Sequence, residues 1–246
     1  MIELKSLSKS YNNIPVFSDV DFRLEMNHII FIIGANGSGK TTFVKLLAQL
    51  IKPDLGSIQI DKYQINNSNE WKKYCKFVLD DSELIDDLNA LDHMSLIGYL
   101  SSIPKILINS RAKILCDIFK IPTNKKIRNI SKGQKCKLNI IMNLLTRPKY
   151  FILDEPFVYL DIESKIILIN LLNTLSNIGC GILVTTNDLS IINSKIHTTY
   201  LIKNGKIDLY KSEFTNNQNL YEEFISLTDD SNIELDFRKT FFWLFE

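Results

Sequence analysis

The residues from Gly34 to Thr41 have the types and the spacing that bind phosphate. The segment reads GANGSGKT and matches the pattern G-x-x-x-x-G-K-[ST]. Its glycines permit a curled backbone whose successive N–H groups point toward one anion. Lys40 is expected to reach the β- and γ-phosphates of a nucleotide as a mobile point charge, and the Thr41 hydroxyl is placed to ligate Mg²⁺. The predicted nucleotide-binding residues of this loop are Gly34, Ala35, Asn36, Gly37, Ser38, Gly39, Lys40, Thr41 and Thr42.

The residues around this loop are expected to place it at the end of a parallel sheet. An unbroken apolar run, residues 29–33, precedes the loop. A short β-branched run of this kind is typical of a strand buried on both faces of a parallel sheet, and it would present the loop at its carboxyl end. A helix is predicted to begin near Lys40 and to continue to Pro53. The positive end of its dipole would face the phosphate.

A pair of carboxylates at the end of another predicted strand is the second chemical feature. Residues 150–156 read YFILDEP, a buried strand that ends in Asp154 and Glu155. Buried charge is costly unless it is paired or binds a metal. Downstream of the phosphate loop, Asp154 would hold Mg²⁺ directly or through water, and Glu155 would polarise an attacking water. Without Lys40, a simple Asp-Glu turn would be the better interpretation.

The remaining predicted strands indicate an α/β fold with an additional antiparallel layer. Residues 2–24 contain two short alternating stretches, IEL and VDFRL, separated by a turn at residues 11–15. Residues 56–61 are predicted to form a further strand of this layer. Residues 181–186 form another buried strand, and residues 199–209 a hairpin around an Asn-Gly turn. The expected architecture is a phosphate-loop NTPase core with a parallel sheet and an antiparallel β layer beside it.

A helical insertion is predicted between the two chemical features. Residues 76–79 have the character of a strand, and residues 91–102 and 109–121 have helical periodicity. A Lys-rich segment, residues 120–137, then leads into an apolar helix that runs to Leu145. Its lysines either form a solvated face or face phosphate, and the sequence favours neither. The predicted division is an ATPase unit at residues 1–210, a helical subdomain inserted at about residues 80–147, and a C-terminal helical tail at residues 211–246.

The composition favours a water-soluble protein of a reducing compartment. The 246 residues are 45% hydrophobic, enough for one large or two small cores, and their net charge is +1. This balance creates no basic field, so nucleic acid is not an expected partner. The four cysteines form no C-x-x-C pair, which favours free thiols. The longest apolar runs are too short to cross a bilayer and the N-terminus lacks the apolar core of a secretory signal, so the expected location is the cytoplasm.

Taken together, the motifs resemble those of the nucleotide-binding subunit of ABC transporters over nearly the whole chain. GANGSGKTT is similar to the family's Walker A loop, and FILDEP is similar to its Walker B strand, with Glu155 as the catalytic carboxylate. ISKGQK resembles the signature sequence of the helical subdomain, and VYLD resembles the D-loop. Tyr11 stands where the family carries an aromatic residue that stacks on adenine, although an aromatic taken alone is more often a packing residue. The resemblance implies ATP and Mg²⁺ as ligands.

The resemblance also implies a dimer that closes head to tail around two ATP molecules. Each ATP would be held by the Walker A loop of one subunit and the signature of the other, where a helix start would contact the γ-phosphate. The dimer would be a homodimer or a heterodimer of ATPase subunits. Its closure would drive membrane permease subunits, which would hold it at the inner face of the cell membrane. The residues expected to contact the partner subunit's ATP are Ser131, Lys132, Gly133, Gln134 and Asp161.

Two positions beside the γ-phosphate differ from the family pattern. The family usually carries a Mg²⁺-binding Gln after the strand at residues 76–79, and here the residue is Asp80, which is shorter and adds negative charge. The family's switch His is here Asn187, which can donate a hydrogen bond but cannot become cationic. Lys132 replaces the first glycine of the signature, a milder change. The predicted catalytic residues are Glu155, Lys40 and Asn187, and the predicted metal ligands are Thr41, Asp154 and Asp80.

These differences leave two functions open. The first is an ATPase subunit with slow hydrolysis that powers a separate permease; residues 219–228 resemble the terminal helix of the export and drug- or peptide-resistance branch, which favours an exporter of peptides or antibiotics. The second is a regulatory or immunity module that closes on ATP and hardly hydrolyses it. A soluble ABC ATPase that acts on nucleic acid is disfavoured by the neutral charge. The aromatic residues at 241–245 either pack on the domain or contact a partner.

Overall fold

The computed structural model describes residues 1–65, 67–79, 84–192 and 197–210. Two predictions from the sequence fall outside these ranges. They are the metal-ligand role of Asp80 and the helical tail at residues 211–246.

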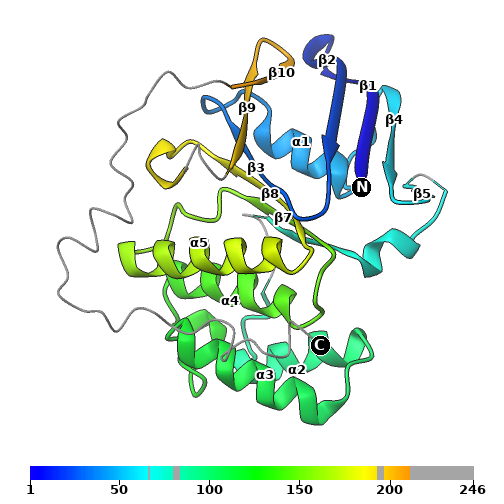
Figure 1. Ribbon diagram of the computed structural model, residues 1–246. Helices are drawn as coiled ribbons and strands as arrows, with labels where there is room; N and C mark the ends of the chain where they lie inside the picture. The colour runs from blue at the N-terminus through cyan, green and yellow to red at the C-terminus, as the bar shows by residue number, and fades with distance from the viewer. Residues whose placement is uncertain (66, 80–83, 193–196, 211–246) are drawn as a thin grey trace.

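A six-stranded sheet forms the centre of the molecule, with the strand order β10-β9-β3-β8-β7-β6 (Figure 1). All of its neighbouring pairs are parallel except the β9–β10 hairpin. Every residue of β3, β7 and β8 is buried, as the apolar runs predicted for strands covered on both faces. The strands are β3 (Ile29–Ile33), β6 (Cys75–Val78), β7 (Tyr150–Asp154), β8 (Gly181–Thr186), β9 (Thr198–Lys203) and β10 (Lys206–Leu209).

A four-stranded antiparallel sheet, in the order β2-β1-β4-β5, forms the predicted second layer. Its two N-terminal strands are much longer than the predicted stretches IEL and VDFRL. The pairing of β1 with β2 contains register shifts, and Ser6 and Asp19 within it have positive φ angles of 48° and 53°. These irregularities let one ladder continue where the alternation of side chains is broken. The strands are β1 (Ile2–Tyr11), β2 (Ile14–Leu24), β4 (Leu55–Ile60) and β5 (Tyr63–Gln64).

Helix α1 (Lys40–Leu47) follows the phosphate loop and packs in the core shared by the two sheets. The prediction that it continues to Pro53 is wrong. The chain leaves the helix at Ala48, and Gln49 adopts the left-handed conformation with φ of 58°. The N–H of Leu50 then bonds back to the carbonyl of Lys45 at 3.0 Å, which satisfies one of the last helical acceptors.

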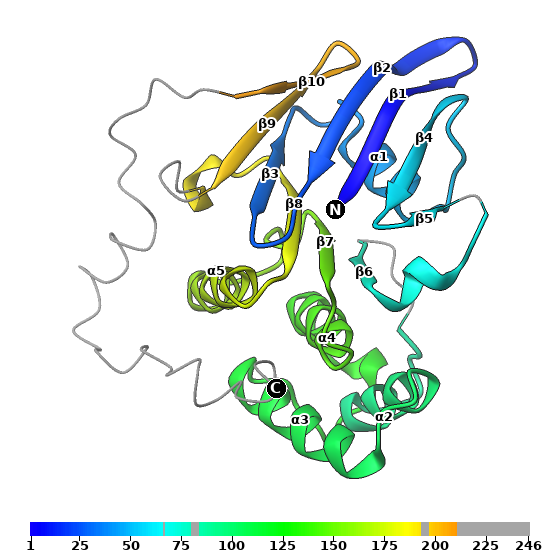
Figure 2. The ribbon, with the colours of Figure 1, turned by 45° about the vertical axis from the view of Figure 1, so that its right-hand side comes forward.

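Helices α4 and α5 lie on the opposite face of the parallel sheet, and α2 and α3 pack beyond α4, away from the sheet (Figure 2). Phe31 of β3 and Phe151 of β7 point into the core of these helices, whereas Ile30 and Ile32 point into the core around α1. This alternation makes a layered molecule with the parallel sheet in the middle. The helices are α2 (Ala90–Leu100), α3 (Lys105–Ile118), α4 (Lys132–Leu144) and α5 (Ile162–Asn177), with short 3₁₀ turns at Glu70–Lys73, Ile127–Asn129 and Leu189–Ile191.

Helices α2, α3 and α4 all lie between β6 and β7 in the sequence, where the helical insertion was expected. Their buried residues belong to the same core cluster as α5 and one face of the parallel sheet. Within the part of the chain that the structure describes, no helix combines the length and the apolarity that a bilayer crossing requires.

Asp61, just after β4, connects the antiparallel sheet to the start of β7. Its carboxylate accepts hydrogen bonds from Lys149 at 2.6 Å, from the Tyr150 hydroxyl at 2.7 Å and from the Met1 amino group at 2.6 Å. Burial alone would raise the pKa of Asp61, but these hydrogen bonds outweigh it and lower the pKa to about 2. The carboxylate is therefore ionised throughout the physiological range.

We expect Asp61→Asn to destabilise the protein near neutral pH and to flatten the acid side of its stability curve. Because the pKa of Asp61 is lower in the folded than in the unfolded chain, its contribution is present above about pH 4 and is lost as the pH falls toward 2. The loss at pH 7 should be about 1–2 kcal/mol after allowance for partial exposure. Urea denaturation between pH 2.5 and 7 measures it. Glu70→Gln, which breaks an exposed pair with Lys73, is the control; equal effects of both changes would contradict the prediction.

Candidate nucleotide-binding and catalytic site

The phosphate loop joins the carboxyl end of β3 to the first residue of α1, as predicted. Gly37 and Gly39 have φ angles of 79° and 108°, a region that residues with a side chain rarely adopt. A Cβ at Gly39 would also lie 2.8 Å from the side chain of Val16 on β2. The loop therefore needs glycine at position 39 both for its backbone conformation and for its contact with the antiparallel sheet.

Lys40 lies at the centre of the loop and is 5% exposed. Its ammonium donates to the carbonyl of Gly34 at 2.8 Å and to that of Ala35 at 3.4 Å. It also forms an ion pair with Oε1 of Glu155 at 3.1 Å. One cation thus links the phosphate loop to the carboxylate pair that follows β7, and the two chemical features of the sequence form one site.

Ser38 shows that the loop is shaped for an anion. Its hydroxyl is buried and has no hydrogen-bond partner among the described residues. A Cβ placed on Gly34 would lie 2.5 Å from this oxygen, so the hydroxyl lies directly over the start of the loop. A buried hydroxyl without an acceptor is costly, and a phosphate oxygen in the loop would supply one. The residues present therefore fit a phosphate group.

The carboxylate pair is held by a residue that the sequence analysis missed. Thr185 of β8 donates its hydroxyl hydrogen to Oδ1 of Asp154 at 2.5 Å. The N–H of Glu155 donates to both the carbonyl and the hydroxyl oxygen of Thr185, each at 3.1 Å. Asp154 is 3% exposed, whereas the side chain of Glu155 is 20% exposed, so the first suits a buried metal ligand and the second suits contact with water. The available signal was a threonine within the apolar run GILVTT, because a buried hydroxyl must find an acceptor.

Asn187 completes the group of three predicted catalytic residues. Its backbone N–H donates to Oε2 of Glu155 at 3.2 Å, and its side-chain amide donates to the Asn36 side chain of the phosphate loop at 3.4 Å. The ends of β3, β7 and β8 therefore meet through Lys40, Glu155 and Asn187. Parallel strands bring their carboxyl ends to one edge of the sheet, which explains why residues so far apart in sequence lie together.

The signature segment lies at the start of α4, and its hydrogen bonds among the described residues are within α4 rather than to the phosphate loop. Ser131 is the N-cap of α4: its hydroxyl accepts from the N–H of Gln134 at 3.2 Å, and the Gln134 side chain accepts from the N–H of Ser131 at 3.0 Å. The Lys132 ammonium lies 5.5 Å from the ring centre of Tyr159. Asp161 is the N-cap of α5. Ser131 and Lys132 are exposed, and the contact with Tyr159 places Lys132 beside the loop that follows Glu155.

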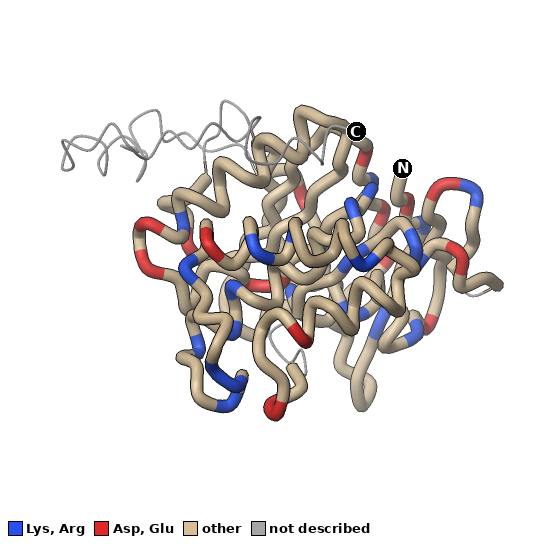
Figure 3. The backbone as a smooth tube through the Cα atoms, turned by 90° about the horizontal axis from the view of Figure 1, so that it is seen from below, with Lys and Arg blue, Asp and Glu red and all other residues tan. Residues whose placement is uncertain are grey.

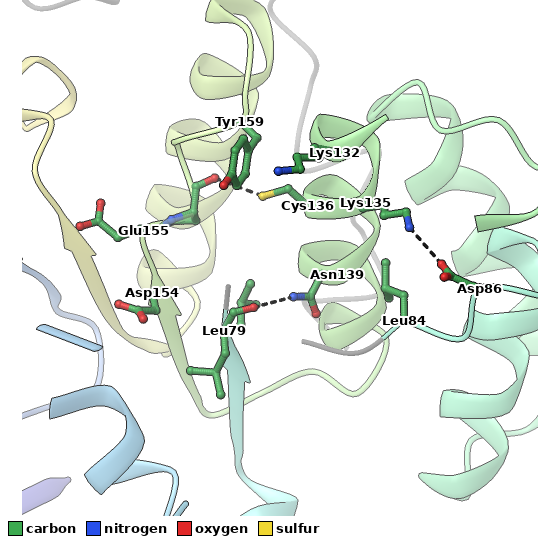
Figure 4. A pocket seen from close by; sticks show the side chains of 12 residues that line it. Leu79, Leu84, Asp86, Lys132, Lys135, Cys136, Asn139, Asp154, Glu155 and Tyr159 are labelled. Atoms are coloured by element: carbon green, nitrogen blue, oxygen red, sulfur yellow. Dashed lines mark hydrogen bonds and ion pairs between the residues drawn. The ribbon is translucent and has the colours of Figure 1, made fainter. Parts of the chain in front are cut away.

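A cavity of about 440 Å³ separates the end of β7 from α4 (Figure 4). Asp154 and Glu155 line one side, and Lys132, Lys135 and Asn139 line the other. Asn139 donates its amide to the carbonyl of Leu79 at 3.2 Å, so α4 also holds the end of β6. The remaining lining residues are Val78, Leu79, Leu84, Asp86, Cys136, Pro156 and Tyr159.

Tyr11 and the two threonines after Lys40 are the other predicted ligand residues. Tyr11 ends β1 and pairs with Ile14 of β2, in the hairpin whose Val16 contacts Gly39, and it is 46% exposed. Its ring is thus partly exposed, and the ammonium of Lys9 lies 5.4 Å from the ring centre. Thr41 is exposed and Thr42 half-buried in the first turn of α1.

Comparison with known proteins agrees with this geometry. The family model of the ABC transporter matches residues 17–158. The chain is 29% identical to the SkfA peptide export ATP-binding protein SkfE of Bacillus subtilis (strain 168), over 92% of this chain and 96% of that protein. It is 27% identical to the ABC-type transporter ATP-binding protein EcsA of the same organism, over 84% of this chain and 85% of EcsA.

Solved structures share the fold. An ATP binding subunit of an ABC transporter superposes with a TM-score of 0.79 at 24% identity and full coverage of both chains. A dimeric, post-hydrolysis state of an ATP-binding cassette bound to ADP and Pi superposes with a TM-score of 0.77 at 23% identity, over 86% of this chain and 98% of the other.

The fold and the site define a phosphate-loop NTPase, with the loop after one parallel strand and the acidic pair after another of the same sheet. Within that class the chain belongs to the ABC transporter family. It is an ATP-binding subunit of that family of ATPases.

We expect Thr185→Val, which is similar in shape but lacks the hydroxyl, to lower the free energy of unfolding by about 1–3 kcal/mol. The buried Asp154 oxygen loses its donor and the N–H of Glu155 loses one acceptor. Urea denaturation measures the change, and Thr185→Ser, which keeps the hydroxyl, is the control. A Val variant as stable as wild type would show that the hydroxyl does not hold the pair.

Proposed function

We propose that this subunit hydrolyses MgATP as a dimer and drives a separate membrane permease that exports peptides or antibiotics. The observation that carries the proposal is the contact of Lys40 with Glu155, which brings the phosphate-binding lysine and a partly exposed carboxylate together in one site. The relative SkfE, whose name describes peptide export, supports export as the direction of transport and peptides as the class of substrate. The subunit would lie in the cytoplasm, held at the inner face of the membrane by the permease.

The residues divide into three roles. The loop amides, Lys40 and the orphan hydroxyl of Ser38 bind the phosphates, and Tyr11 stacks on adenine. Thr41 and Asp154 would hold Mg²⁺, with Asp80 as a further ligand, and the bound metal would supply positive charge beside the phosphates. Glu155 polarises the attacking water. All three donors of Lys40 already have protein acceptors, so a phosphate oxygen that binds the ammonium must replace at least one of them.

The signature residues act on the ATP of the partner subunit. Within one subunit, the described contacts of the signature residues are with α4 and with Tyr159, which suits a role in a dimer. These residues are Ser131, Lys132, Gly133 and Gln134, and Asp161 joins them across the interface. We assign residues 1–210 to the ATPase unit, about residues 80–147 to its helical subdomain and residues 211–246 to a C-terminal tail. Basic and acidic residues are interspersed along the backbone in Figure 3, which gives nucleic acid no preferred face in that view.

One observation favours a second candidate, a regulatory or immunity module that binds ATP with little hydrolysis. The side chain that contacts the phosphate loop from β8 is the neutral amide of Asn187. It can donate to a γ-phosphate but supplies no positive charge there.

The proposal is tested by comparing the steady-state ATP turnover of wild type and of Glu155→Gln. Dimerisation is followed in the same samples. We expect wild type to turn over ATP, and we expect the Gln variant to lose at least about 100-fold in kcat because it cannot polarise water. The variant should remain dimeric in MgATP, since its binding residues are unchanged. If both proteins bind ATP and neither hydrolyses it, the second candidate is correct.

The contribution of position 187 is measured by Asn187→His. We expect kcat to rise several-fold, because His retains a donor toward the γ-phosphate and becomes cationic near neutral pH. The gain should be greater at pH 6 than at pH 8, and this pH dependence separates charge from shape. Equal turnover of the variant and wild type at both pH values would show that the residue does not limit the rate.

A further inference from the structure

Helix α4 buries a lysine whose partner lies in the loop after Glu155. Lys137 is 8% exposed, and its ammonium lies 3.5 Å from Oδ2 of Asp161. Within the described ranges this is the one ion pair of Lys137. The side chain of Asp161 is 66% exposed, so the pair lies where α4 meets the surface and gives the largely buried lysine a carboxylate partner.

Asp161 uses its other oxygen to start the next helix. Oδ1 accepts from the N–H of Ser164 at 2.8 Å, which caps α5. Burial alone would raise the pKa of Asp161, but the hydrogen bonds from Ser164 and the charge of Lys137 outweigh it and lower the pKa. One ionised carboxylate therefore fastens the end of this loop to both α4 and α5.

The rest of the loop packs on the same face of α4. A Cβ at Gly133 would lie 2.6 Å from the carbonyl oxygen of Tyr159, and the Cys136 thiol donates to the carbonyl of Pro156 at 3.5 Å. Figure 4 shows the contact of Cys136 with this loop. Positions 133, 136 and 137 form one face of the helix because they are three and four residues apart. The first two turns of α4 thus hold the loop near its start, middle and end.

Glu155 is the residue at which this loop begins, and it has a constrained backbone. Its φ angle is 48°, which is uncommon for a residue with a side chain and persists only where the surroundings fix it. On the strand side it is fixed by Thr185 and Asn187. On the loop side, the contacts with α4 determine the direction in which the chain leaves it.

We propose that Lys137 is a positioning residue for hydrolysis: by holding Asp161, it fixes the loop at residues 155–161 and so the orientation of the Glu155 carboxylate. The inference rests on the proposed ATPase function and adds a residue that does not touch the nucleotide. Lys126, an exposed lysine that pairs with Asp87 at 3.3 Å and does not line the site, serves as the matched control.

The test compares Lys137→Met, Lys137→Arg and Lys126→Met with wild type in the full chain. Hydrogen exchange of the amides at residues 157–165, measured without nucleotide, reports how firmly the loop is held. Steady-state kinetics then report kcat and KM for MgATP. We expect the Met variant at position 137 to exchange faster in this loop and to lose about 10- to 100-fold in kcat, because small misplacements of a catalytic group are costly. KM should change less than kcat, since the phosphate-loop residues that bind ATP within the same subunit are untouched.

The Arg variant should recover most of both effects, and Lys126→Met should resemble wild type. Unchanged exchange after Lys137→Met would overturn the inference, as would faster exchange with unchanged kcat. If thermal melting shows that the Met variant does not fold, Lys137→Gln replaces it with the same expectations. If wild type has no turnover, the proposed function fails, and the exchange data alone then decide whether Lys137 holds the loop.

Discussion

The contact between the Lys40 ammonium and the Glu155 carboxylate is the interaction on which the site depends. It joins a loop from the start of the chain to a strand end more than a hundred residues later, in a place where both groups are largely shielded from water. Charge interactions are stronger there than at the surface, so the lysine needs strong acceptors. The protein supplies two loop carbonyls and one carboxylate, and a nucleotide supplies phosphate oxygens in the same place. Binding of ATP and placement of the carboxylate that would activate water are therefore linked through one side chain.

The fold around this contact explains why the site has two sides. The parallel sheet brings the ends of β3, β7 and β8 to one edge, and the polar residues at those ends hold one another through Thr185 and Asn187. Helix α4 approaches the same edge from the helical layer and contacts the loop after Glu155 through its first two turns. The signature residues cap that same helix, so a movement of α4 would reach both the signature and the loop that carries Glu155.

The sequence predicted the parts of this structure that depend on local patterns. The phosphate loop, the buried strands and the acidic pair were placed correctly because the glycine spacing and the apolar runs are local signals. The end of α1 was missed because a left-handed Gln49, with no glycine or proline to mark it, stops the helix early. Thr185 and Lys137 were missed because their roles depend on contacts between segments distant in sequence. Sequence periodicity identifies a buried position but does not identify the polar group that it faces.

Titration calorimetry that compares the MgATP affinity of Lys40→Met with that of wild type tests the central claim most directly. Lys45→Met, in the last turn of the same helix, is the control for a change of charge on α1. If Lys40 is the cation that binds phosphate, its loss should weaken MgATP binding by at least about 100-fold, which is about 2.7 kcal/mol, while Lys45→Met should bind like wild type. Binding by Lys40→Met within about threefold of wild type would contradict the account, because the phosphate would then be held without the residue around which the site is built.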